Sequence, residues 1–248
     1  MGHKANAPRK WDVFVSSNHS MSTVPQVEKG GYTHAVLMGD LIGSEAASSI
    51  KELHQQFNHA VDQTNQLAAD RLVSPLTITL GDEFQGVCRS LSDGLWIMRR
   101  VRYALLAQDV FCRFVLGVVR LETEVPSNKA WNMMGPGLSA ARDRLADKKD
   151  PNVYRFQLPE HELLQSLLGA VGYAATAIEL DWSSRQQQIV LASAEDKPAA
   201  QLSRELGLAT RTLYKIRHSA RFDVYQSQWR AMMKAAEALD HDYGLPSR

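Results

Sequence analysis

The sequence predicts an α+β domain followed by a small all-helical domain. Strand-like and helix-like stretches alternate up to about residue 158, and helical spacing alone follows from about residue 160. A hairpin whose turn carries two adjacent acids lies in the middle of the alternating part. The predicted organisation is a mobile tail of no assigned function at 1–30, the mixed domain at 31–158, a linking helix at 159–182 and the helical domain at 183–248.

The mixed domain is predicted from apolar periodicity. A helix begins at the capping-box pair Ser49 and Glu52 and ends near Asp70, where Ser74-Pro75 separates it from the hairpin. The order is βαββαβ with an extra helix, which is the ferredoxin-like arrangement. Its further elements are the strands Tyr32–Met38, Thr77–Leu80, Phe84–Cys88, Val110–Leu121 and Val153–Gln157, and the helices Ser92–Ala107 and Leu138–Asp147.

Composition is that of an ordinary soluble protein, with 44% hydrophobic residues, 22% charged residues and a net charge of +1. Cys88 and Cys112 lie in apolar surroundings, so we expect buried thiols rather than a disulfide. No spacing suggests zinc, and no signal peptide or apolar run of about eighteen residues is evident. We therefore expect a cytoplasmic protein without a membrane segment.

Three acids are predicted to meet at one site. Asp82 and Glu83 share the hairpin turn after Gly81, where like charges repel unless a cation compensates them. Asp40 follows the first strand, which pairs centrally with the hairpin in a ferredoxin-like sheet. The alternative is that all three acids only form turns or cap a helix.

The segment around Asp40 also suits phosphate. Gly39, Leu41 and Gly43 lie where the backbone can approach a ligand, and Ser44 is predicted to open a helix with free amides. Carboxylates and phosphate oxygens together are ligands that Mg²⁺ or Mn²⁺ prefers. We therefore expect a nucleoside triphosphate with a divalent cation at Asp40, Asp82 and Glu83, and Gly81 beside it.

The motifs resemble those of nucleotide-handling families. Asp40-Leu-Ile-Gly-Ser44 resembles a segment of class III nucleotidyl cyclases, and Leu80-Gly-Asp-Glu-Phe84 resembles both their hairpin and that of diguanylate cyclases. This implies a palm-type domain in which Asp40 and Asp82 bind two metals. Arg142 matches a cyclase arginine, whereas Leu138 occupies the position of the cyclase Asn, which counts against cyclisation.

Over residues 32–220 the sequence is most similar to the SatD family. The similarity lies in Gly39–Ser44, in Pro75–Gly86 and in the helix that contains Arg142. The resemblance implies a fold and a site, and it implies little about an activity.

The C-terminal part is predicted to bind an anionic partner. Residues 183–234 contain nine Lys or Arg and four Asp or Glu, a net charge of +5. The predicted helices are Ser184–Ala194, Pro198–Leu206, Ala209–Ala220 and Phe222–Leu239, and Gln201–Ile216 resembles a bacterial helix-turn-helix. That resemblance implies that the third helix of the unit enters the DNA major groove. The implied DNA-facing residues are Thr210, Arg211, Tyr214 and Lys215, with Arg217 and Arg221 on phosphates. A protein-binding module is the alternative.

Three functions remain open from the sequence. The first is a regulator in which nucleotide and magnesium binding alters DNA binding. The second is an active nucleotidyl cyclase or nucleotidyltransferase with metals at Asp40 and Asp82. The third is a catalytically dead palm-like dimerisation module. Cyclase sites lie at dimer interfaces and helix-turn-helix units commonly bind as dimers, so we expect a homodimer.

Overall fold

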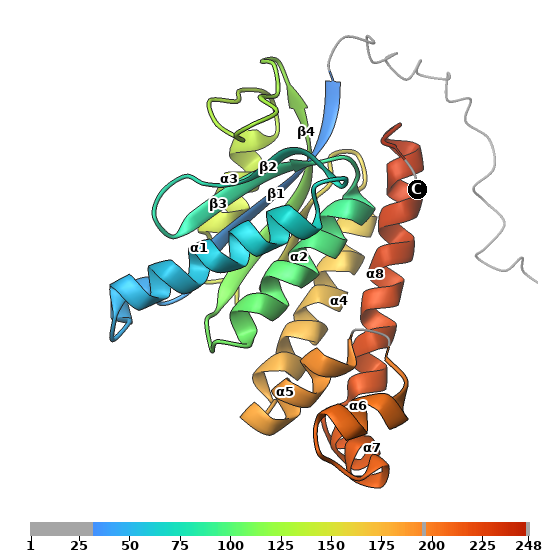
Figure 1. Ribbon diagram of the computed structural model, residues 1–248. Helices are drawn as coiled ribbons and strands as arrows, with labels where there is room; N and C mark the ends of the chain where they lie inside the picture. The colour runs from blue at the N-terminus through green and yellow to red at the C-terminus, as the bar shows by residue number, and fades with distance from the viewer. Residues whose placement is uncertain (1–31, 195–196, 247–248) are drawn as a thin grey trace, which may run out of the picture. The chain divides into compact units, whose positions relative to one another are not determined.

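The computed structural model describes residues 32–194 and 197–246, which belong to one compact unit. The tail predicted at 1–30 lies outside the described residues. The unit is mixed α/β, with one sheet and helices on both of its faces (Figure 1).

Five strands form the sheet, in the order β2-β3-β1-β4-β5. Neighbouring strands are antiparallel, except that β4 and β5 run parallel. The longest strands, β1 and β4, lie next to each other, so β1 is paired on both of its edges. The strand bounds are β1 (Tyr32–Leu41), β2 (Leu72–Ile78), β3 (Glu83–Cys88), β4 (Cys112–Leu121) and β5 (Tyr154–Gln157).

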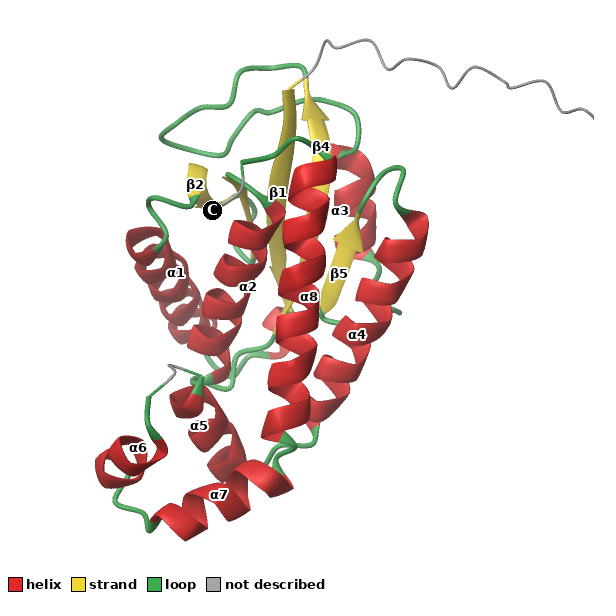
Figure 2. Ribbon diagram, turned by 90° about the vertical axis from the view of Figure 1, so that its right-hand side faces the viewer, coloured by secondary structure: helices red, strands yellow, loops and turns green. Residues whose placement is uncertain are grey.

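Helices cover the two faces unequally. One face carries α1 (Ile50–Leu67), α2 (Leu91–Leu106), α4 (Glu162–Leu180) and α8 (Phe222–Asp242), and the other carries α3 (Leu138–Ala146) (Figures 1 and 2). Because successive side chains of a strand point to opposite faces, each strand supplies both cores. Leu37 and Phe114 face the four-helix side, while Val36 and Val115 face α3.

Three short helices form a unit with its own core. They are α5 (Ser184–Ser193), α6 (Ala199–Glu205) and α7 (Thr210–Ser219). Ile189, Leu202 and Leu213, one from each helix, are buried together at their centre. Gly207 has a φ of 62° in the turn between α6 and α7, a conformation that glycine adopts without steric cost.

The first strand is longer than the periodicity predicted. It continues to Leu41 because β3 and β4 both pair with residues 39 and 40. The predicted helix start at Ser44 is wrong: this segment forms only a 3₁₀ turn, η1 (Ser44–Ala46). The α-helix begins at Ile50, where the Ser49 hydroxyl accepts the Glu52 N–H as predicted.

The Ser74-Pro75 pair does not separate helix from strand. It lies within β2, where the pairing with β3 is irregular. Proline is tolerated there because β2 is an edge strand and has no second neighbour to which an N–H could donate. The Ser74 hydroxyl donates to the carbonyl of Pro126.

Helix α4 lies within the linking helix predicted at 159–182, and it is more apolar than the sequence analysis allowed. Among the described residues it is one helix of 19 residues with a hydropathy of 1.4, so by length and composition alone it could cross a membrane. It also packs on β5 and α8, and its Glu179 is 4% exposed. The two cysteines are free and buried, as predicted.

Candidate functional site

The predicted acids lie at the end of the central strand. In the register of β1, Asp40 is opposite Glu83 on β3 and opposite Arg113 on β4. Opposite residues of adjacent strands share a face, so these side chains gather on the face that carries α3. We call Asp40, Asp82 and Glu83 the acidic corner.

Asp82 joins the corner from the β2–β3 turn. Its backbone carbonyl accepts the Leu41 N–H at 3.0 Å, which ties the turn to the end of β1. Its Oδ2 accepts the Ser44 hydroxyl at 2.8 Å. The β2–β3 turn is therefore joined to the segment after β1 by two hydrogen bonds. One links the side chains of Ser44 and Asp82, which are 38 residues apart, and the other links the backbones of Leu41 and Asp82.

Burial perturbs the Asp40 carboxyl. The residue is only 9% exposed, and burial raises the pKa of its carboxyl to about 6. The Arg113 guanidinium lowers this pKa, whereas the negative charges of Asp82 and Glu83 raise it further. The acidic corner therefore has three carboxylates, and the Arg113 guanidinium beside Asp40 does not fully compensate their negative charge.

The acids are adjacent, yet they do not form a ready metal cage. Within residues 32–194 and 197–246, no group of three or more His, Cys, Asp or Glu side chains is arranged to hold a metal ion. Two carboxylates already have partners: Asp40 Oδ2 lies 3.2 Å from Arg113 Nε, and Asp82 accepts from Ser44. Asp40 and Asp82 are thus each engaged through one carboxylate oxygen within the protein.

An open cleft of about 440 Å³ adjoins the corner on the α3 face. Buried Gln85 organises it, because its amide donates to the Ala130 carbonyl at 2.7 Å and its Oε1 accepts from Arg142 at 3.2 Å. Arg142, which the sequence predicted as a site residue, therefore reaches the cleft from α3. The lining also includes Thr79, Leu80, Glu83, Trp131 and Asn132.

The structure adds residues that sequence reasoning missed. Arg113 is one of two arginines in the otherwise apolar strand β4, and Gln85 is a polar residue in the buried strand β3. A polar or charged residue at such a position indicates that a partner is needed. Trp131 gave no such signal, and it is 45% exposed at the mouth of the cleft.

The glycines predicted to approach a ligand differ from one another. A Cβ at Gly39 would lie 2.3 Å from the Phe84 ring, so close packing alone accounts for this glycine. Gly43 and Gly81 have φ values of 76° and 63° and open space around them. Their backbones are thus accessible, and each forms a turn that favours glycine.

The predicted DNA-facing residues lie on α7 and just beyond it. Arg211, Tyr214 and Lys215 are exposed, while the Thr210 hydroxyl lies 3.1 Å from that of Ser203. Arg217 instead holds the helices together: its Nε donates to Ser193 at 2.8 Å, and its guanidinium lies over the Phe222 ring. Arg221 is the N-cap residue of α8, and its Nη1 lies 3.9 Å from Asp181 Oδ2.

The fold and the acidic corner define a mixed α/β protein whose central strand ends in carboxylates beside an open cleft. Residues 34–235 match the SatD family, and the chain belongs to this family. Among curated proteins, none matches the chain.

A bacterial light-regulated adenylyl cyclase of solved structure is weakly similar. The similarity has 11% identity and a TM-score of 0.40, and covers 53% of this chain. The chain spans 44% of the length of that cyclase.

Proposed function

We propose that the chain is a nucleotide-binding regulatory protein. The acidic corner, with Mg²⁺ or Mn²⁺, takes the phosphates of a nucleoside triphosphate, the adjoining cleft takes the rest of the nucleotide, and α7 contacts DNA. The observation that carries the nucleotide proposal is the meeting of Asp40, Asp82 and Glu83 at one end of β1, where Glu83 also lines a cleft of about 440 Å³.

The residues present fit a cation that arrives with phosphate. Asp40 and Asp82 would hold it, and a bound Mg²⁺ neutralises phosphate charge. Ser44 orients the Asp82 carboxylate, and Arg142 brings a positive charge to the cleft. Arg113 Nε is buried and lies 3.2 Å from Asp40 Oδ2 without forming a well-directed hydrogen bond, and a phosphate oxygen would give it a better acceptor.

Binding fits the corner better than catalysis. Arg113 already lies against Asp40, so this carboxylate has fewer free oxygens for the two metals of a catalytic mechanism than for one cation. Leu138, at the position of the cyclase Asn, is 2% exposed in the core on the α3 face and cannot reach a ribose. We therefore place the nucleotidyl cyclase or nucleotidyltransferase second and the dead dimerisation module third.

A ferredoxin-like palm is the fold that we propose for the first part. The strand order β2-β3-β1-β4 and the antiparallel pairing of these four strands support it. In such a sheet the end of β1 and the β2–β3 turn are neighbours, which is the arrangement the nucleotide site requires.

Thermal unfolding with and without ligand tests the nucleotide proposal. Mg²⁺ with ATP or GTP should raise the midpoint of the wild-type protein relative to EDTA, because a ligand that binds only the folded state stabilises it. Asp82→Asn should lose this shift, and Asp143→Asn, an exposed acid of α3, should keep it. No shift with any triphosphate would favour the dimerisation module, and product formed by wild type but not by Asp82→Asn would favour the enzyme.

The DNA proposal is limited to the exposed face of α7, formed by Thr210, Arg211, Tyr214 and Lys215. Arg217 is left out because it packs between helices. Anisotropy of a labelled duplex of mixed sequence should show salt-sensitive binding that Arg211→Gln with Lys215→Gln abolishes. Arg230→Gln, an exposed arginine of α8, is the control. Equal binding by both variants would remove DNA from the proposal.

The homodimer proposal is placed on α4. Its exposed face carries Leu163, Leu167, Tyr173 and Leu180, each more than half exposed. A second copy would cover this apolar surface. Light scattering should give twice the monomer mass for the wild type and the monomer mass for Leu163→Glu with Leu167→Glu. A wild-type monomer would remove the dimer.

A further inference from the structure

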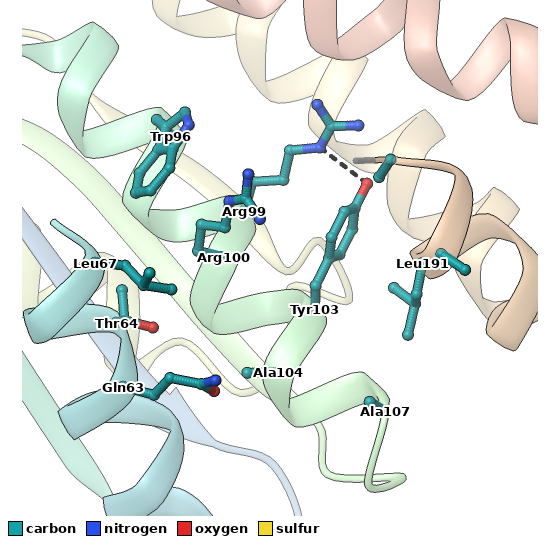
Figure 3. Close-up of a pocket in the computed structure, with 12 residues that line it drawn as sticks. Gln63, Thr64, Leu67, Trp96, Arg99, Arg100, Tyr103, Ala104, Ala107 and Leu191 are labelled. Atoms are coloured by element: carbon teal, nitrogen blue, oxygen red, sulfur yellow. Dashed lines mark hydrogen bonds between the residues drawn. The ribbon is translucent and has the colours of Figure 1, made fainter. Parts of the chain in front are cut away.

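A second cleft lies between α1, α2 and α5, and none of its lining residues belongs to the acidic corner. Its volume is about 350 Å³, at the small end for ligand sites. Figure 3 shows Gln63, Thr64 and Leu67 reaching it from α1, and Leu191 from α5. The wall between them is α2, which contributes Trp96, Arg99, Arg100, Tyr103 and Ala104.

The charge of this cleft is positive. Arg99 and Arg100 line it, and its described lining contains no Asp or Glu. Among the described ion pairs none includes Arg100, whereas the nearby Arg71 is paired with Asp93 at 2.6 Å. A cationic lining of this kind favours an anionic ligand.

The two arginines have different roles. Arg99 is held by two hydrogen bonds within the protein. Its Nε donates to the Tyr103 hydroxyl at 2.9 Å (Figure 3), and its Nη2 donates to Gln226 of α8 at 2.7 Å. The Arg100 guanidinium lies over the Trp96 ring at 4.9 Å. A guanidinium on an aromatic face keeps its N–H edge for a phosphate or carboxylate, so Arg100 is the group suited to a ligand.

The remaining walls suit a ring. Trp96, Tyr103, Leu67 and Leu191 offer aromatic and apolar surface, and the Gln63 amide offers one donor and one acceptor at the edge. The Arg71 and Arg100 guanidiniums already lie over the Trp96 ring, and that of Arg99 lies over the Tyr103 ring. The surface left for a flat ring is therefore the apolar surface of Leu67 and Leu191. A cationic and partly apolar lining around a volume of about 350 Å³ favours an anionic ligand of mononucleotide rather than dinucleotide size.

The location connects two parts of the protein. Leu191, Ala192 and Ala194 belong to α5 or its end, and α5 shares a core with α7 through Ile189, Leu202 and Leu213. The Gln187 amide donates to the Leu106 carbonyl at the end of α2, so α5 already contacts α2 beside the cleft. A ligand between them adds contacts to both helices.

We propose that this cleft, which we call the α2–α5 cleft, binds a small anionic ligand with a heterocyclic ring, of nucleoside monophosphate size. Arg100 takes the anionic group, and the ring packs against Leu67 and Leu191. Occupancy stabilises α5 against α2 and so fixes the three-helix unit that contains α7. The inference does not depend on the acidic corner or on a metal.

The test uses the full-length chain in EDTA, with adenosine 5′-monophosphate as the probe and adenosine and inorganic phosphate as its two halves. Calorimetric titration should show saturable binding of the monophosphate, and binding at least tenfold weaker for each half. Arg100→Gln should weaken it tenfold or more through loss of a charged hydrogen bond. Arg89→Gln, an exposed arginine outside the cleft, and Asp82→Asn, in the acidic corner, should keep the wild-type affinity.

Hydrogen exchange gives the second readout. The monophosphate should slow amide exchange in residues 184–193 of the wild type and not of Arg100→Gln, whose thermal midpoint is measured to confirm that it folds. Wild-type affinity in Arg100→Gln, or no binding up to millimolar probe, overturns the proposal. Binding lost in Asp82→Asn and kept in Arg100→Gln also overturns it, because the probe would then occupy the acidic corner.

Discussion

Asp40 and Arg113 form an ion pair across β1 and β4, with Asp40 Oδ2 3.2 Å from Arg113 Nε. Both residues are buried, at 9% and 7% exposure. The guanidinium occupies one side of the carboxylate that we propose as a cation ligand. Arg113 therefore competes with a cation for Asp40 in the free protein.

Replacing Arg113 should expose this competition. Arg113→Gln leaves Asp40 without its charge partner, which costs about 3 kcal/mol of unfolding free energy in EDTA. Mg²⁺ should restore part of that loss and should stabilise the variant more than the wild type, because the cation replaces the missing charge. Urea titrations in EDTA and in Mg²⁺ measure both effects. Equal stabilisation of the two proteins by Mg²⁺ would contradict the proposed role.

The raised pKa of Asp40 predicts a pH dependence of stability. The folded state binds the proton with a pKa of about 6 and the unfolded state with the model value of 3.8, so this group makes the fold more stable as pH falls from about 6 to about 4. Urea titrations at several pH values measure this effect. As pH falls over this window, the free energy of unfolding of the wild type should rise relative to that of Asp40→Asn by on the order of 2 kcal/mol. A difference that does not vary with pH would show that Asp40 titrates normally.

The same protonation predicts weaker cation binding in acid. A proton and a cation compete for the Asp40 carboxylate, so the stabilisation by Mg²⁺ with ATP should decline as pH falls through about 6. Calorimetric titration between pH 5 and pH 8 measures it. In Asp40→Asn the residual binding should be nearly independent of pH over that range, and an unchanged decline would assign the proton to another group.

Glycine substitutions should separate packing from backbone conformation. Gly39→Ala places a Cβ against the Phe84 ring and should cost about 1–3 kcal/mol of unfolding free energy. Gly43→Ala meets no neighbour within 4 Å and should cost only about 1 kcal/mol, for its positive φ. Urea denaturation compares the two. A smaller cost at position 39 than at 43 would contradict the packing assignment.

A buried ion pair should make Glu179 the most sensitive acid of α4. Its carboxylate accepts from Arg102 at 2.9 and 2.7 Å and from the hydroxyls of Tyr154 and Tyr225. Glu179→Gln leaves Arg102 buried without a counter-charge and should cost about 3–5 kcal/mol in urea denaturation. Glu162→Gln, exposed on the same helix, should change stability by less than about 0.5 kcal/mol.

Local sequence patterns predicted the presence of the helices and strands more reliably than their first and last residues. The hairpin, the helix cap at Ser49 and the buried cysteines follow from residue types and spacing, and the structure confirms them. The end of β1 was placed too early because strand length depends on pairing with β3 and β4. Ser74-Pro75 was placed outside the strand because only the sheet order identifies β2 as an edge.

The sequence by itself determined where the acids fall in the chain and that Asp40 and the hairpin turn belong to one sheet. Only the tertiary structure decided that Arg113 lies against Asp40, that Gln85 holds Arg142 at the cleft, and that Glu179 pairs with Arg102. Hydrophobic periodicity is a local property and can be recognised within a single segment of the sequence. The pairing of side chains across strands and helices is set by register and packing, which depend on the burial of the whole chain.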